Sequence, residues 1–108
     1  RVCGMAGMFH SASSFNQDIS AWDVSNVACW NNDKVGMWRV FYGASSFNQD
    51  ISTWDVSSVT SMSEMFYGAS SFNQDLSNWD VGSVIYCNDF SLDAINWTLP
   101  KPNFITCQ

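Results

Sequence analysis

An octapeptide that occurs three times limits what this chain can fold into more than any other feature. Ser13–Ser20 and Ser45–Ser52 both read SSFNQDIS, and Ser70–Ser77 reads SSFNQDLS. The second and third copies are 25 residues apart, whereas the first and second are 32 residues apart. A period of about 20–50 residues is typical of solenoids, in which each unit buries its apolar face against its neighbours. The sequence therefore predicts a stack of similar units.

Alignment on the octapeptide divides residues 1–108 into four repeats of one solenoid domain. Seven extra residues lie between Val27 and Phe41 and lengthen the second repeat. The last repeat is degenerate, with Pro100 and Pro102 at positions where a ladder would need a backbone donor. Atypical terminal repeats usually act as caps. The predicted bounds are approximately 2–26, 27–58, 59–83 and 84–108.

The expected fold class is a leucine-rich-repeat-like solenoid, built from short strands and a short helical turn in each repeat. The stretch FNQDISTWDVSSVT combines apolar residues with turn-forming Asp-Ile-Ser and Asp-Val-Ser, which indicates extended segments joined by corners. The helical turn is predicted from apolar residues at i, i+3, i+4 and i+7, namely Met62, Met65, Phe66 and Ala69.

Composition removes several classes of partner. Ten acidic residues against four basic ones give a net charge of −6, which argues against nucleic acid and anionic membrane surfaces. The apolar runs are only a few residues long, so no membrane insertion is expected in this segment. The chain opens at Arg1 without an initiator Met or a leader, which indicates a mature or excised piece. Cations, glycans and other proteins remain as partners.

The four cysteines favour disulfides over a metal site, because no CxxC pair is present and His10 is the single histidine. Cys3 and Cys29 lie nearly in column by their phase in the repeat, so Cys3–Cys29 is one expected bond, and the remaining pair gives Cys87–Cys107. Asn96 opens an Asn-Trp-Thr acceptor triplet for N-glycosylation. Together these features predict an extracellular or cell-surface protein.

The repeat FYGASSFNQDISTWDVSSVTSM, with its FNQD and WDV landmarks and the MF pair that stands before the octapeptide in two other copies, resembles that of the BspA-like leucine-rich-repeat surface proteins. This group was first catalogued as a mycoplasma domain of unknown function. The resemblance covers roughly Met8 to Phe90. It implies a secreted or cell-surface protein that serves adhesion and interaction rather than catalysis.

Stacking would place aspartates in two columns, where like charges repel. One interpretation is that each Asp caps a corner by accepting backbone N–H bonds, and we favour it. The alternative is a calcium ladder, although no calcium-loop spacing is present. Asn16, Asn48 and Asn73 are expected to form an amide ladder. The aspartates concerned are Asp18, Asp50 and Asp75 in one column, and Asp23, Asp55 and Asp80 in the other.

Tryptophans allow two interpretations as well. Trp22, Trp54 and Trp79 could hold sugar rings, but their fixed phase favours the core. The insertion at 28–40 is the better candidate for a partner-binding loop, since extra residues often lie on the binding face. The competing interpretation folds its tryptophans back over a repeat, because exposed Trp is costly. The candidate partner-binding residues are Trp30, Lys34, Trp38 and Arg39.

We therefore expect a non-catalytic extracellular module with a structural or adhesive role. No GxSxG, HExxH or phosphate-loop motif is present, and no cofactor beyond calcium is implied. Its expected partners are further copies of itself, stacked end to end into a glycosylated surface fibre, or other surface proteins and glycans. The alternative is a glycan- or protein-binding module that uses the insertion. Ice binding is a third interpretation, weakened because the chain has only four Thr, none in a TxT column.

Overall fold

Successive tight turns replace the helical turn that the sequence predicts. In the computed structural model, which describes residues 5–25, 36–105 and 107, the N–H of Met65 donates to the Met62 carbonyl at 3.2 Å. A second such turn closes from Ala69 to Phe66 at 3.0 Å, and the turn between them closes from Tyr67 to Glu64 at 3.3 Å. The third residue of the first and the last of these turns is left-handed, Glu64 at φ 55° and Gly68 at φ 68°. This geometry requires a positive φ at that position and interrupts a helix.

The expected short strands are also wrong for the part of the chain that the structure describes, which contains no helix and no strand. Its nearest approach to a sheet is one isolated parallel bridge between Ser61 and Tyr86. In the turn segments only every second N–H reaches the neighbouring repeat, as from Phe41 to the Met65 carbonyl at 2.8 Å. The intervening N–H groups close the tight turns, so no extended ladder develops.

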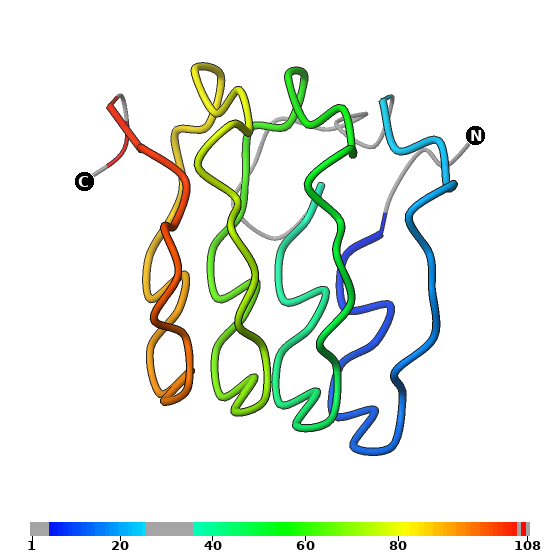
Figure 1. The fold of residues 1–108 in the computed structure, drawn as a ribbon. Helices are drawn as coiled ribbons and strands as arrows, with labels where there is room; N and C mark the ends of the chain where they lie inside the picture. Colours follow the sequence, from blue (N-terminus) through cyan, green and yellow to red (C-terminus); the bar gives the residue numbers. More distant parts are fainter. Residues whose placement is uncertain (1–4, 26–35, 106, 108) are drawn as a thin grey trace.

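Equivalent segments of the four repeats nevertheless lie side by side. Figure 1 shows the chain in successive loops, with the first and the last described loops on opposite sides of the molecule. The whole measures 29 × 27 × 22 Å. We refer to the described parts as repeat 1 (5–25), repeat 2 (36–58), repeat 3 (59–83) and repeat 4 (84–105 and 107).

The core is one cluster of apolar side chains in which each aromatic ring packs on its counterpart in the next repeat. Phe47 stacks between Phe15 at 5.7 Å and Phe72 at 5.8 Å between ring centroids. A second column runs beside it, with Phe41 at 5.2 Å from Phe66 and at 4.2 Å from Phe47. Much of the burial in each repeat is therefore supplied by the repeat next to it.

Two of the three repeated tryptophans lie in the core, as predicted. Trp54 and Trp79 are 4% and 5% exposed. Their indole N–H groups donate to the carbonyls of Ile19 and Ile51 in the preceding repeat, at 3.0 and 3.1 Å. Trp22 differs, because it is 39% exposed and the described residues contain no earlier repeat to cover it.

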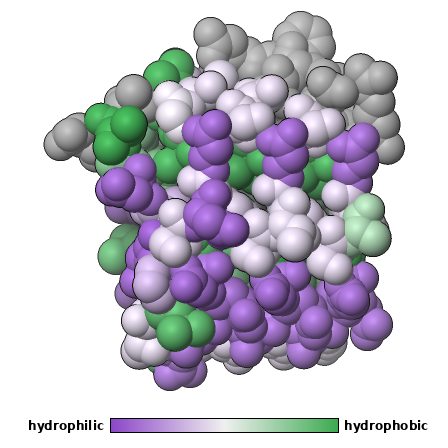
Figure 2. All heavy atoms as spheres, turned by 45° about the horizontal axis from the view of Figure 1, so that its top comes forward, coloured by the Kyte–Doolittle hydropathy of each residue, from purple (hydrophilic) through white to green (hydrophobic). Residues whose placement is uncertain are grey.

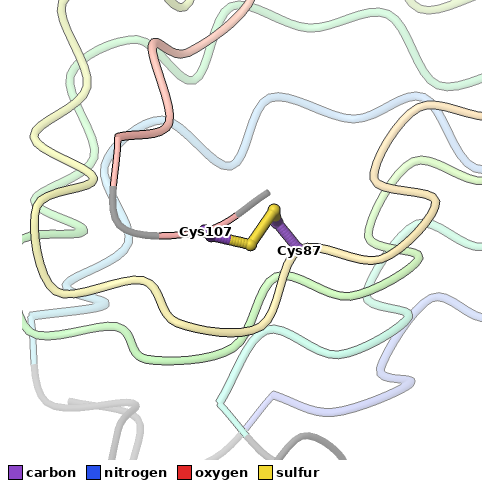
Figure 3. The surroundings of a disulfide bond; sticks show 2 residues. All are labelled: Cys87 and Cys107. Atoms are coloured by element: carbon purple, nitrogen blue, oxygen red, sulfur yellow. A yellow bond between two sulfur atoms is a disulfide. The ribbon is translucent and has the colours of Figure 1, made fainter.

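Repeat 4 is closed by the predicted Cys87–Cys107 disulfide, whose Cα atoms are 6.0 Å apart (Figure 3). The bond ties the tail to the start of the repeat and leaves Cys107 buried. Phe104 stands at the tryptophan position and packs edge-on against Phe90 at 4.9 Å. The predicted Cys3–Cys29 bond lies outside the described residues. The covalent link and these aromatic contacts hold together the end that has no neighbour.

Candidate functional site

The six repeated aspartates all cap turns. In the first column Oδ1 of Asp18, Asp50 and Asp75 accepts the N–H of the serine two residues later, at 2.9 Å in each case. In the second column Asp23, Asp55 and Asp80 accept the N–H two residues later, at 3.1 Å. The capping interpretation is therefore confirmed, and it explains why the aspartates recur with the repeat.

These hydrogen bonds favour the ionised carboxylate. The hydrogen bond from the serine hydroxyl makes the largest contribution to lowering the pKa of the carboxyl, and the bond from the serine N–H adds to it. For Asp50 the neighbouring charge of Asp18 acts the other way but is outweighed. The pKa is lowered from its usual value at Asp18, Asp50, Asp55 and Asp75.

The same columns offer little to a metal ion. A hollow of about 410 Å³ lies between Asp50 and Asp75 and is also lined by Gln74 and Leu99. Across residues 5–25, 36–105 and 107, however, no three His, Cys, Asp or Glu side chains come close enough to hold a cation. One oxygen of each carboxylate is already used in its own turn.

The Asn-Gln pair of the octapeptide joins one repeat to the next. Oδ1 of Asn16 accepts the N–H of Asn48 at 2.8 Å, and Oδ1 of Asn48 accepts the N–H of Asn73 at the same distance. The amides of Gln49 and Gln74 donate to these same oxygens at 3.0 Å. The expected ladder of asparagine side chains bonded to one another is therefore wrong. The asparagine oxygen instead satisfies backbone donors, which is a structural role.

Of the four candidate residues in the insertion, Trp38 and Arg39 are described, whereas Trp30 and Lys34 lie outside the described residues. Nε of Arg39 donates to Oε1 of Glu64 at 2.7 Å. Its guanidinium also lies over the rings of Trp38 and Tyr42, at 4.7 and 4.5 Å from their centroids. The structure thus brings Trp38 and Arg39 together on a half-buried surface, where each already has an intramolecular partner.

A surface column of aromatic rings runs beside this cluster and was missed by the sequence reasoning. His10 stacks on Tyr42 at 4.7 Å and Tyr42 on Tyr67 at 4.8 Å, with the planes within 7° of parallel. The signal was present in the shared phase of these three residues. Tyr42 raises the pKa of Tyr67. Because the ring of Tyr42 is covered on both faces by its two neighbours, it has only its edge to offer a ligand, which suits a pyranose poorly.

The two ends of the stack, at repeat 1 and repeat 4, expose large apolar side chains. Figure 2 shows hydrophilic side chains recurring in rows across the surface, and hydrophobic ones at the side of repeat 4. Exposed apolar residues of repeat 4 are Ile85, Leu92, Ile95, Leu99 and Ile105. A hollow of about 500 Å³ lies there between 89–93 and the tail, lined by Lys101, Pro102 and Phe104. At the other end Met8 and Trp22 are 44% and 39% exposed.

Comparison with known families assigns the chain to one of them. The model described as Mycoplasma protein of unknown function, DUF285, matches residues 1–32 and 26–103. The chain belongs to this family. No curated protein and no solved structure matches it. Within the described residues of this family member, no helix is long and apolar enough to cross a membrane.

Proposed function

We propose that the chain is a non-catalytic extracellular repeat module that serves a structural or adhesive role as a subunit of a glycosylated surface fibre. In this proposal it is a BspA-like, leucine-rich-repeat-like solenoid at the cell surface. Its four coils stack end to end with further copies. Its partners are then copies of itself, or other surface proteins and glycans.

The observation that carries this proposal is the lateral dependence of the core. Phe41 and Phe47 are fully buried because repeats lie on both sides of them. The counterparts in repeat 1, Phe9 and Phe15, are only half-buried. An end that exposes part of a core layer is suited to receive another layer, as in repeat proteins that grow by adding units.

An oxidising, glycosylating compartment is supported by repeat 4. The Cys87–Cys107 disulfide is typical of secreted domains. Asn96 is exposed, and its Nδ2 donates to the Ser70 carbonyl at 2.8 Å. An amide nitrogen has two hydrogens, so one remains for attachment of a sugar.

Negative-stain electron microscopy of the protein secreted by a eukaryotic host, with intact mass before and after deglycosylation, tests the proposal. We expect filaments and a mass that falls by one glycan. Asn96→Gln should remove the glycan, whereas Thr98→Ser keeps the acceptor triplet and should retain it. Single particles at the bare polypeptide mass at every concentration would contradict the fibre and the glycan together.

The alternative is a glycan- or protein-binding module that uses the insertion at 28–40. The cluster of Trp38, Arg39 and Tyr42 favours it, because a guanidinium between aromatic rings is a common recognition element. Arg39→Gln should then abolish binding to an array of surface glycans and proteins, whereas Lys101→Gln at the far end should not. Equal binding by both variants would count against this alternative.

A further inference from the structure

We infer that the stack has a chemical direction, with a donor edge at repeat 4 and an acceptor edge at repeat 1, so that a second copy of this chain docks head to tail. This inference rests on the proposed fibre. It goes beyond it by naming the contact and by excluding symmetric pairing of like ends.

The direction comes from the backbone hydrogen bonds of the turn segments. Four alternate N–H groups in each of repeats 1, 2 and 3 donate to carbonyls of the following repeat. Among the described residues only the backbone N–H groups of Ile85 and Tyr86, which share the Thr60 carbonyl, donate to a carbonyl of the preceding repeat. The first of the four bonds runs from Met5 to Gly36, from Met37 to Ser61 and from Met62 to Tyr86, and the other three follow it. Repeat 1 bonds repeat 2 from Gly7 to Trp38, Phe9 to Val40 and Ser11 to Tyr42. Repeat 2 bonds repeat 3 from Arg39 to Ser63, Phe41 to Met65 and Gly43 to Tyr67. Repeat 3 bonds repeat 4 from Glu64 to Asn88, Phe66 to Phe90 and Gly68 to Leu92.

This pattern leaves different groups unused at the two ends. The donor edge consists of the backbone N–H groups of Asp89, Ser91 and Asp93, which find no acceptor among the described residues. The acceptor edge consists of the carbonyls of Ala6, Met8 and His10, which receive no hydrogen bond from the described part of the chain. Unpaired backbone rows of this kind are templates for a further chain.

The two edges match in register. Residues 89–93 have the same phase in the repeat as 7–11, and each internal donor bonds the carbonyl one position earlier in the following repeat. Continuation of the internal pattern pairs Asp89 with Ala6, Ser91 with Met8 and Asp93 with His10 of the next copy. The backbones have the same shape as well: Asp89 and Gly7 are left-handed at φ 53° and 66°, and Asp93 and Ser11 at 63° and 58°.

Like ends cannot pair in this way. Two acceptor edges would oppose carbonyl to carbonyl, and two donor edges would oppose N–H to N–H, so neither contact forms a hydrogen bond. A head-to-tail contact is heterologous, and one that does not close into a ring gives an open filament.

Side chains at the same ends continue the columns of the core. Met8 has the phase of Phe90, and Trp22 has the phase of Phe104. Phe90 and Phe104 both line the 500 Å³ hollow of repeat 4, whereas Met8 and Trp22 are exposed on repeat 1. Docking in register covers both apolar surfaces and adds a hydrophobic contribution to the hydrogen bonds.

Two variants that each block one edge test the direction. Met8→Asp puts a carboxylate at the acceptor edge, where it would face Asp89 and Asp93 of the preceding copy. Ser91→Arg puts a long charged side chain across the hollow at the donor edge. Ala6→Arg and Leu92→Arg provide a second pair if either variant unfolds. Thr53→Asp and Ser58→Arg introduce the same charged residues at exposed positions of repeat 2 and serve as matched controls.

The oligomeric state is read by sedimentation and mass photometry of the disulfide-bonded protein. We expect the wild type and both controls to form long assemblies, and each edge variant alone to stay monomeric. An equimolar mixture of Met8→Asp and Ser91→Arg should give a discrete dimer of twice the monomer mass that contains one of each variant.

Three outcomes distinguish this inference from the proposed function. A wild type that stays monomeric at every concentration overturns the fibre and the direction together. Assembly of the wild type combined with homodimers of either edge variant leaves the fibre standing and overturns the direction. Unimpaired assembly by both edge variants shows that copies join through the sides, and it also overturns the inference.

Discussion

Trp22 and Trp54 occupy the same position of the repeat but have different surroundings. Each is followed by Asp-Val-Ser, yet Trp22 is 39% exposed and Trp54 only 4%. The Trp54 indole bonds to the Ile19 carbonyl of the preceding repeat. Trp22 has no earlier repeat among the described residues to supply such a carbonyl. The comparison teaches that burial in this protein depends on a residue's neighbouring repeat as much as on its own sequence.

The largest expected effect on the free energy of unfolding is the difference between an interior and a terminal phenylalanine. Phe47→Ala should lower the free energy of unfolding by about 3–5 kcal/mol, because it empties a site packed from both sides. Phe15→Ala, at a half-buried ring of repeat 1, should cost clearly less. Urea unfolding followed by tryptophan fluorescence measures both. Equal losses would show that the neighbouring repeat contributes nothing to burial.

The next effect concerns the end that replaces a neighbour with a covalent bond. The double variant Cys87→Ser/Cys107→Ser should lose about 2–4 kcal/mol, because the disulfide restricts the unfolded chain. Hydrogen exchange should show the loss as early opening of repeat 4, with repeat 2 still protected. Uniform loss of protection would mean that the disulfide supports the whole stack.

A smaller effect tests the tryptophan comparison itself. Trp54→Phe removes one of the two donors to the Ile19 carbonyl, which keeps its bond from the Trp22 backbone N–H, and should cost about 0.5–1.5 kcal/mol beyond the lost contacts. Trp22→Phe removes no side-chain hydrogen bond to any residue that the structure describes and should be nearly neutral. Thermal unfolding of the two single variants decides the matter, and a Trp22 variant as unstable as the Trp54 variant would contradict the account.

The smallest effect is the pH dependence of the aspartate caps. The pKa values of Asp18, Asp50, Asp55 and Asp75 are lowered in the folded state. Their stabilisation is therefore complete above the unfolded pKa of about 3.9 and is lost as pH falls through the folded values. Solvent screening keeps the change small. Asp50→Asn should reduce the slope of unfolding free energy between about pH 4 and pH 2, whereas Ser58→Ala should leave it unchanged.

The repeat phase could be predicted from the sequence because identical letters occupy identical environments. It placed Trp54 and Trp79 in the core, assigned the aspartates to turns and paired Cys87 with Cys107. The local geometry could not be predicted in the same way. Tight turns with i to i+3 hydrogen bonds place Met62, Met65 and Phe66 on one side, as a helix would. The distinguishing signal was Gly68, which takes the left-handed conformation one residue before the end of the expected helical turn at 62–69.

The role of the asparagines could not be predicted from the sequence pattern, for a related reason. Asn48 satisfies a backbone donor of the next repeat, and that donor exists only once the corner has formed. The environment of Arg39 is similar, because its partner Glu64 lies 25 residues away in the sequence. Such contacts depend on register between repeats. The period predicts which residues of successive repeats lie next to one another, but it does not predict the rotamer that each side chain adopts.

Residue-resolved amide hydrogen exchange tests the central claim, that each repeat is held by directional bonds to the next. Phe41 and Phe66 donate to the following repeat, whereas Ser91 occupies the same phase without a described acceptor. The account predicts slow exchange at Phe41 and Phe66, fast exchange at Ser91 in dilute protein, and slow exchange at Ser91 once copies assemble. Exchange at Phe66 as fast as at Ser91 in the folded monomer would contradict it.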